Sequence, residues 1–234
     1  MIKRIRLATA KRGLGREEFA GGWREAVAAA ASAPARARPA RLTVSVALPE
    51  ITAGQRHDGV SLEWFGDREH LRRFESWLGT PSGRAVQRLR SEVLELDASP
   101  VVVASERVVG GADWLERRWH EGGPKLKQLA LATRADGLTL PQFLERWRGR
   151  TETVGGAPIP DAYRGHACVQ NHPLVEAGRD WAYDAINEVY LDDVDSLLGR
   201  SAYVERELAG GAGSDLVRAN WFLAVSEDPV RLPL

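Results

Sequence analysis

The chain opens with an alternating segment that is followed by a helical one. Charged and apolar residues alternate from Ile2 to Ala10, and such alternation places successive side chains on opposite faces of a β-strand. After a loop at Gly13, Phe19 and Trp23 stand four residues apart, a spacing that puts both on one face of a helix. The pattern therefore predicts a strand, a turn and a helix that packs Phe19 and Trp23 against a core.

The same pattern returns in the second half of the chain, shifted by 124 residues. Residues 126–133 alternate, Gly137 follows, and Phe143 and Trp147 repeat the helical spacing. Self-similarity of this kind indicates a duplicated structural unit, so we interpret the chain as two copies of one unit. The identical residues at this offset pair Lys3 with Lys127, Leu7 with Leu131, Ala8 with Ala132, Thr9 with Thr133, Leu14 with Leu138 and Arg24 with Arg148.

Each copy continues with two more strands, a second helix and a last strand. We predict strands over 41–49 and 60–66 in the first copy, and over 163–172 and 181–191 in the second. The second helices begin near Asp67 and Asp192, where an acidic side chain can cap the first turn. The resulting order, β-α-β-β-α-β, is the ferredoxin-like arrangement.

The predicted fold class is therefore α+β, with two tandem ferredoxin-like units in one chain. One such unit leaves one face of its sheet uncovered, and two units can cover each other's open faces in a closed or nearly closed barrel with helices outside. We assign residues 1–109 to the first unit, 110–124 to a connecting segment with a short helical middle, and 125–234 to the second unit.

Composition narrows the function classes. The formal net charge is +0, which argues against a nucleic-acid binder that relies on a positive field and against electrostatic attachment to a membrane. The single cysteine excludes an internal disulfide, and no cysteine cluster suggests structural zinc. No apolar run approaches the roughly 18 residues of a membrane span, and the first residues lack the apolar core of a signal peptide. We expect a soluble cytoplasmic protein.

Three short motifs resemble the EthD-like branch of the dimeric α+β barrel proteins. They are the opening strand followed by GL and EEFxxxW, the segment VQNH at Val169–His172, and YDAINEVY at Tyr183–Tyr190. The resemblance implies a barrel between the two halves, as a pseudo-dimer within one chain, and leaves a further homodimer possible. It also implies chemistry on aromatic or polyketide-like compounds without a metal or organic cofactor. In one respect the chain departs from the family, because the histidine of the WxxxH pattern is replaced by Val27 and Thr151.

The candidate site starts from the stretch RGHACVQNHPL at residues 164–174. In a strand, His166, Cys168, Gln170 and His172 share one face, which we expect to point into the barrel. Histidine exchanges protons near neutral pH, and a neighbouring carboxylate orients it and raises its pKa. The predicted catalytic residues are therefore His166 or His172 as the acid/base, with Asp184 or Glu188 as partner. The predicted substrate-binding residues are Gln170, Tyr190, Cys168, Asp58 and Trp64.

Other interpretations of this face stay open. The face can be an interior filled by polar side chains that hydrogen bond to one another. Cys168 can be a nucleophile or an inert thiol. His166, Cys168 and His172 can also converge on a metal. No third ligand has a recognisable spacing, so we assign no metal. We expect His57 at the surface, and Trp23 and Trp147 in the core.

The sequence favours a cofactor-independent enzyme that acts by proton transfer on a small, largely apolar organic molecule. The predicted reaction is that of a lyase, cyclase or isomerase in degradation or secondary metabolism. A cofactor-free monooxygenase is the second enzymatic hypothesis. A non-catalytic small-ligand-binding or accessory protein is the alternative from another class, and the missing WxxxH histidines favour it.

Overall fold

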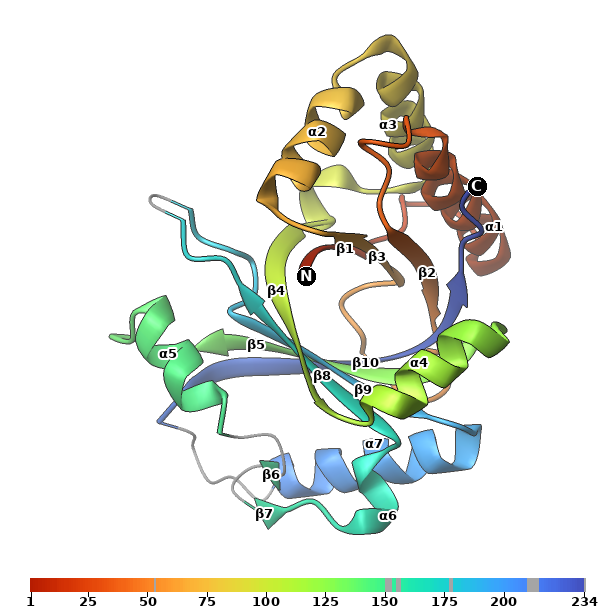
Figure 1. Ribbon diagram of the computed structural model, residues 1–234. Helices are drawn as coiled ribbons and strands as arrows, with labels where there is room; N and C mark the ends of the chain where they lie inside the picture. Colours follow the sequence, from red (N-terminus) through yellow and green to blue (C-terminus); the bar gives the residue numbers. More distant parts are fainter. Residues whose placement is uncertain (53, 150–152, 155–156, 177–178, 210–214, 234) are drawn as a thin grey trace. The chain divides into compact units, whose positions relative to one another are not determined.

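The computed structural model describes residues 1–234 apart from 53, 150–152, 155–156, 177–178, 210–214 and 234. Within these residues the protein is a mixed α+β structure with a closed antiparallel barrel of eight strands, hydrogen-bonded in the order β1-β3-β2-β10-β5-β9-β8-β4. The chain divides into two compact units (Figure 1). Unit 1 comprises Met1–Ala47, Arg56–Ser105 and Glu227–Leu234, and unit 2 comprises Leu48–Gln55 and Glu106–Ser226.

In unit 1, helices cover one face of a sheet with the strand order β4-β1-β3-β2. Trp23 and Phe19 lie in the first helix with no more than 2% of their surface exposed, and the Trp23 indole donates to the Ser45 carbonyl at 3.2 Å. Both residues are core residues, as predicted. The elements are β1 (Ile2–Ala8), α1 (Arg16–Ala28), β2 (Arg41–Ala47), β3 (Gly59–Phe65), α2 (Arg68–Leu78), α3 (Pro81–Val93) and β4 (Val101–Gly110), with 3₁₀ turns at Ala29–Ser32 and Leu96–Ala98.

In unit 2, the sheet has the strand order β10-β5-β9-β8, and α5 and α7 pack on one of its faces. The elements are α4 (Ala112–Glu121), β5 (Lys125–Arg134), α5 (Leu140–Trp147), β6 (Thr153–Val154), β7 (Ala157–Pro158), α6 (Asp161–Arg164), β8 (Ala167–Pro173), β9 (Ala185–Leu191), α7 (Val194–Ala209) and β10 (Val217–Pro229). The predicted helical middle of the connecting segment is α4, and the position Thr151 of the absent histidine lies outside the described residues.

The strand predicted over 163–172 is shorter than expected. Asp161–Arg164 forms a helical turn, and β8 begins only at Ala167. The reason is Gly165, whose φ of 75° lies in the left-handed region that favours glycine and turns the chain into the strand. The helix predicted to begin near Asp192 is α7, and its capping residue is Asp193, whose side chain accepts from the backbone N–H of Ser196.

Asp58 and Asp184, each shortly before the third barrel strand of its half, make matching contacts. The Asp58 carboxylate accepts from the backbone N–H of Ala10 at 2.8 Å in unit 1, and the Asp184 carboxylate accepts from that of Arg134 at 2.7 Å in unit 2. Gly13 and Gly137 have φ values of 88° and 83°, so both turns use the left-handed region. The same side chains thus hold the same local geometry in each half.

A buried cluster of ionised side chains joins β1, β3 and α3 in unit 1. Glu63 on β3 is fully buried and accepts from Arg4 at 2.5 Å and from Arg90 at 2.9 Å. Burial opposes ionisation of Glu63, but the two guanidinium groups outweigh it and lower the pKa of the carboxyl. The cluster ties helix α3 to the sheet on the face that the helices cover.

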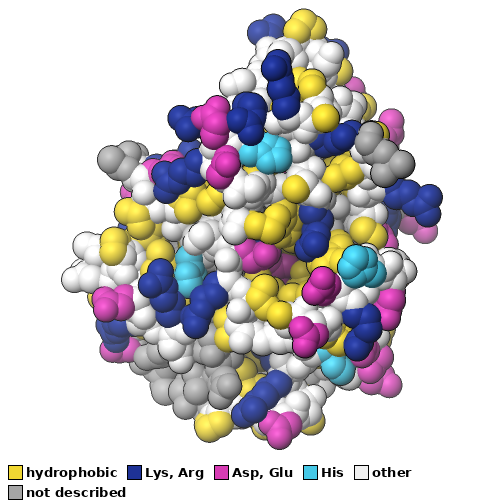
Figure 2. All heavy atoms as spheres, in the orientation of Figure 1, with side chains coloured by type: hydrophobic (Ala, Val, Ile, Leu, Met, Phe, Trp, Pro, Cys, Tyr) yellow, Lys and Arg dark blue, Asp and Glu magenta, His cyan; other side chains and the backbone are white. Residues whose placement is uncertain are grey.

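Charges of both signs share the surface. In the face shown in Figure 2, Lys and Arg side chains lie interspersed with Asp and Glu side chains, in keeping with the net charge of +0. Among the described residues, no helix is both long and apolar enough to cross a bilayer.

Candidate functional site

The sheet of unit 2 has two chemically different faces. Val169 on β8 lies opposite Glu188 on β9, and Cys168 lies opposite Val189. Because residues that face each other across a strand pair point to the same side, Val169 and Glu188 share one face and Cys168 and Val189 share the other. We call these the open face and the helix face.

The expectation that the face with Cys168 and Gln170 points into the barrel is wrong, because helices pack on that face. Cys168 packs against a hydrophobic cluster that contains Val189 and Leu197 of α7, and Gln170 donates to the Trp147 carbonyl at the end of α5 at 3.3 Å. The alternation of the strand separates its residues into two sets correctly. It does not show which set the helices cover, and here the helices pack on the set containing Cys168.

The two predicted catalytic histidines differ in exposure and in the group that lies beside them. His166 precedes β8, its side chain is 50% exposed, and its Nε2 lies 3.0 Å from the Asp192 carboxylate. His172 is buried at 5% exposure and its Nε2 lies 3.2 Å from the Gln170 amide oxygen. The carboxylate that lies beside His166 is Asp192 rather than the expected Asp184 or Glu188.

His172 is held in its neutral form. Burial lowers its pKa to about 4, and the positive charges of Arg148 and Arg107 act in the same direction. The Arg107 guanidinium also donates to the Gln170 amide oxygen at 3.3 Å. These contacts make His172 and Gln170 part of the packing between β8 and its neighbours.

Two predicted site carboxylates have structural roles. Asp184 forms an ion pair with the Arg134 side chain in addition to the backbone bond, and Asp58 fixes the turn after β1. Trp64 is buried at 1% exposure, with the Lys3 ammonium 4.8 Å from its ring centroid, a cation–π contact. The prediction of a surface position for His57 is wrong, since it is 5% exposed and lies 3.1 Å from the Thr9 hydroxyl.

The open face of unit 2 carries a buried polar cluster centred on Glu188. Its carboxylate accepts from the Lys127 ammonium at 2.7 Å, from the Tyr190 hydroxyl at 3.0 Å and from the Asn171 amide at 2.9 Å. All four side chains are at most 2% exposed. We call these four residues the Glu188 cluster.

One atom of the Glu188 cluster is left without a hydrogen bond. The Asn171 amide nitrogen donates to Glu188 and to the Ile186 carbonyl at 3.0 Å, but its Oδ1 has no partner among the described residues. A buried polar atom without a partner costs free energy on the order of 1–3 kcal/mol. Such an atom is positioned to accept a hydrogen bond from a ligand or from a water molecule.

Helix α4 brings aromatic side chains to this face. Trp114 and Leu115 pack with Ala167, Val169 and Tyr190, and the Trp114 ring centroid lies 5.9 Å from that of Tyr190. The Glu188 cluster therefore borders an apolar wall. Apolar surface beside a few convergent polar groups is the composition of a small-molecule site.

Of the Glu188 cluster, the sequence analysis named Glu188 and Tyr190 as candidate site residues but not Lys127 or Asn171. The signal for Lys127 was present, because it alternates in phase with Leu129 and Leu131, both buried at no more than 1% exposure. A lysine in phase with core residues of a strand needs an anionic partner. Among the described residues, no group of three or more His, Cys, Asp or Glu side chains is placed to hold a metal ion.

Comparisons with known proteins give a fold and no family. No family model and no curated protein sequence matches the chain. A crystal structure from Fusobacterium nucleatum subsp. nucleatum ATCC 25586, named a "putative monooxygenase", matches at a TM-score of 0.51 with 10% identity, over 98% of this chain and 92% of that one. Another protein so named, from Lactobacillus acidophilus NCFM, matches at a TM-score of 0.49 with 9% identity, over 97% and 93%. The likeness to the first shows a shared fold, which in this chain is an α+β structure with a closed barrel of eight strands. Membership of the EthD-like family stays a prediction.

Proposed function

We propose that the protein is a cofactor-independent enzyme that binds a small, largely apolar organic molecule against the open face of unit 2. The observation that carries this proposal is the Glu188 cluster, in which Tyr190 packs with Trp114 of α4 and the Asn171 Oδ1 has no partner among the described residues. A carboxylate in an apolar, water-poor setting is a base for carbon acids.

The reaction that we favour is monooxygenation without a bound cofactor. It is the activity named for the Fusobacterium nucleatum neighbour, with which the chain shares its fold. Glu188 removes a proton from an activated CH₂ flanked by aromatic or carbonyl groups, and the neighbouring Lys127 ammonium stabilises the enolate oxygen. The carbanion reduces O₂, a C–O bond forms, and the resulting peroxide loses water. The CH₂ becomes a C=O, one oxygen atom enters the product and the other leaves as water.

A proton-transfer lyase, cyclase or isomerase is the second candidate. It uses the same first step, since Glu188 takes a proton from carbon in either case, but needs no O₂. The polar donors around the carboxylate, Tyr190 and Lys127, return that proton at another atom of the substrate. A catalytic role for His166 or His172 remains a prediction that variants at those positions test.

We also propose that the two halves are ferredoxin-like units whose pairing reproduces a dimer within one chain, as in a fused relative of the EthD-like proteins. The strand orders β4-β1-β3-β2 and β10-β5-β9-β8 are equivalent when the halves are aligned, and this equivalence supports the proposal. The matching contacts of Asp58 and Asp184 support it further.

The test uses a panel of anthrone-like and polyketide-like carbon acids under ¹⁸O₂, with an oxygen electrode and mass spectrometry of the products. We expect incorporation of one ¹⁸O per turnover, and a loss of about 10²–10⁴-fold in kcat for Glu188→Gln. The matched control is Glu205→Gln, a carboxylate at an exposed position of α7 in the same unit, which should retain kcat within about threefold.

The outcomes separate the candidates. Product formation that depends on Glu188 but proceeds without O₂ supports the lyase or isomerase. Equal activity of Glu188→Gln and the parent refutes the site. Saturable ligand binding without any turnover in the parent supports the non-catalytic binding protein.

A further inference from the structure

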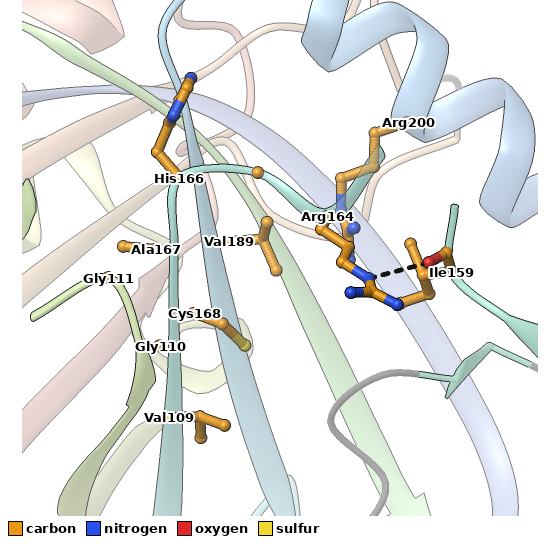
Figure 3. Close-up of a pocket in the computed structure, with 11 residues that line it drawn as sticks. Val109, Gly110, Gly111, Ile159, Arg164, His166, Ala167, Cys168, Val189 and Arg200 are labelled. Carbon is orange, nitrogen blue, oxygen red and sulfur yellow. Dashed lines mark hydrogen bonds between the residues drawn. The ribbon is translucent and has the colours of Figure 1, made fainter. Parts of the chain in front are cut away.

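A pocket lies on the helix face of unit 2, outside the Glu188 cluster. It has a volume of about 200 Å³ and lies where the end of β4, the start of β8 and helices α6 and α7 meet (Figure 3). Its lining includes the side chains of Arg164, His166, Cys168 and Arg200. No aspartate or glutamate belongs to the described lining, so every ionisable side chain there except the thiol is basic.

Arg200 is the unusual member of this lining. It is 6% exposed, and its guanidinium donates to the Gln128 amide oxygen at 2.9 Å and to the Tyr163 carbonyl. Both acceptors are uncharged, and no carboxylate pairs with Arg200 among the residues that the structure describes. By contrast, the buried Arg4 and Arg90 of unit 1 both bind Glu63. A buried cation with only neutral partners is expected to attract an anion.

The other two basic side chains are nearer to solvent. Arg164 lies 3.0 Å from Asp161 and His166 lies 3.0 Å from Asp192, and both basic side chains are about half exposed. Surface pairs of this kind exchange partners at small cost because water and salt screen them. Arg164 can therefore turn its planar donor group to a bound oxyanion, a ligand that arginine binds well through two parallel hydrogen bonds.

Backbone geometry shapes the wall of this pocket. Gly111 and Gly165 both have positive φ, and a Cβ on Gly111 would come within 2.0 Å of the His166 carbonyl oxygen. Gly111 lets the end of β4 approach the start of β8, and Gly165 lets the start of β8 approach β9, where an added Cβ would lie 2.6 Å from the Tyr190 carbonyl oxygen. The shape of the pocket thus depends on positions that only glycine occupies without strain.

We propose that this pocket binds a small oxyanion, a carboxylate or a phosphate, through Arg200 and Arg164. A volume of about 200 Å³ admits a ligand of the size of phosphate or a short dicarboxylate. The proposal concerns a site separate from the open face, and it stands or falls independently of the enzymatic function.

The alkylation rate of Cys168 can report whether an anion occupies the pocket. It is the only cysteine of the chain and it lines the pocket, so alkylation by iodoacetamide is read as a single mass shift of the intact protein. Burial raises the pKa of the Cys168 thiol, and the positive charge of Arg200 acts against that rise. An anion bound to Arg200 would cancel the effect of the arginine on the thiol pKa and would block the approach of iodoacetamide to Cys168. Both effects slow alkylation.

The experiment measures the rate of Cys168 alkylation against the concentration of inorganic phosphate, malonate or propionate, with ionic strength held constant by NaCl. We expect a saturable slowing of at least about threefold with phosphate or malonate. A stronger effect of phosphate identifies a phosphate ligand, and a stronger effect of malonate or propionate identifies a carboxylate. The absence of saturable slowing with all three anions overturns the proposal.

Two variants locate the site. Arg164→Gln, at a half-exposed position, should raise the apparent Kd about fivefold to tenfold without loss of structure. Arg200→Gln should abolish the slowing, and circular dichroism checks that it folds, because Arg200 also holds Gln128 and Tyr163. An anion effect that is unchanged in Arg164→Gln overturns the proposal, whether or not Arg200→Gln folds.

Discussion

Glu63 is the residue whose removal should destabilise unit 1 most sharply. Its carboxylate is the only one bound to Arg4 and Arg90 among the described residues, and all three side chains are at most 7% exposed. Glu63→Gln keeps the size of the side chain but leaves two buried guanidinium groups without an anion. Breaking a buried ion pair from one side costs about 3–5 kcal/mol, and we expect about 4 kcal/mol here. For a chain of this size that corresponds to a fall in Tm of about 8–16 °C.

The pH dependence of this loss gives a sharper test. The folded-state pKa of Glu63 is lowered, so its contribution to stability is fully present above the unfolded-state pKa and is lost as the pH falls towards the folded-state pKa. The difference in unfolding free energy between the parent and Glu63→Gln should be constant from pH 7 to about pH 5. Below about pH 4.3 it should shrink by about 1.4 kcal/mol per pH unit.

Urea unfolding followed by tryptophan fluorescence at several pH values measures both quantities. Glu75→Gln, at an exposed position of α2, is the matched control and should stay within about 0.5 kcal/mol of the parent. A loss below about 1 kcal/mol for Glu63→Gln, or a loss that does not change between pH 7 and pH 3, would refute the reasoning.

Three further predictions follow from single contacts. Burial, together with neighbouring arginines, lowers the pKa of His57 and His172 to about 4, so their NMR titration midpoints should lie near that value. The free energy of unfolding should fall as the pH is lowered from about 6.5 towards 4, because the unfolded chain takes up protons there and the folded chain does not. Titration midpoints near 6.5 would contradict this prediction. Gly165→Ala should lower the free energy of unfolding in urea by more than about 2 kcal/mol, because its Cβ would approach the Tyr190 carbonyl oxygen within 2.6 Å. Gly137→Ala has open space around the added Cβ and should cost about 1 kcal/mol. Equal costs for the two variants would count against the close approach at Gly165. Thr139→Ala removes the capping box of α5 and should lower the unfolding free energy by about 1 kcal/mol, and no change in Tm would exclude a role for this cap.

Local pattern predicted most of the elements. A single strand alternates and a single helix repeats every three to four residues, whatever surrounds it. These elements can therefore be read from sequence, as for the strands Ile2–Ala8 and Lys125–Arg134 and the helix with Phe19 and Trp23. The mixed α+β class follows from the order of these elements. The main local error, the strand expected from residue 163, arose because a glycine with positive φ is indistinguishable in sequence from any other glycine.

The candidate site was decided by tertiary structure. Strand alternation placed Cys168, Gln170 and His172 together, and it placed Glu188 and Tyr190 together, as the structure has them. Which set meets the helices depends on the packing of α5 and α7, and no periodicity within a single strand encodes that choice. Lys127, Asn171 and Glu188 lie far apart in sequence and become a cluster only through the register of β5, β9 and β8. The sequence by itself determined the faces of each strand, and the packing of helices on the sheet determined which face became the polar site.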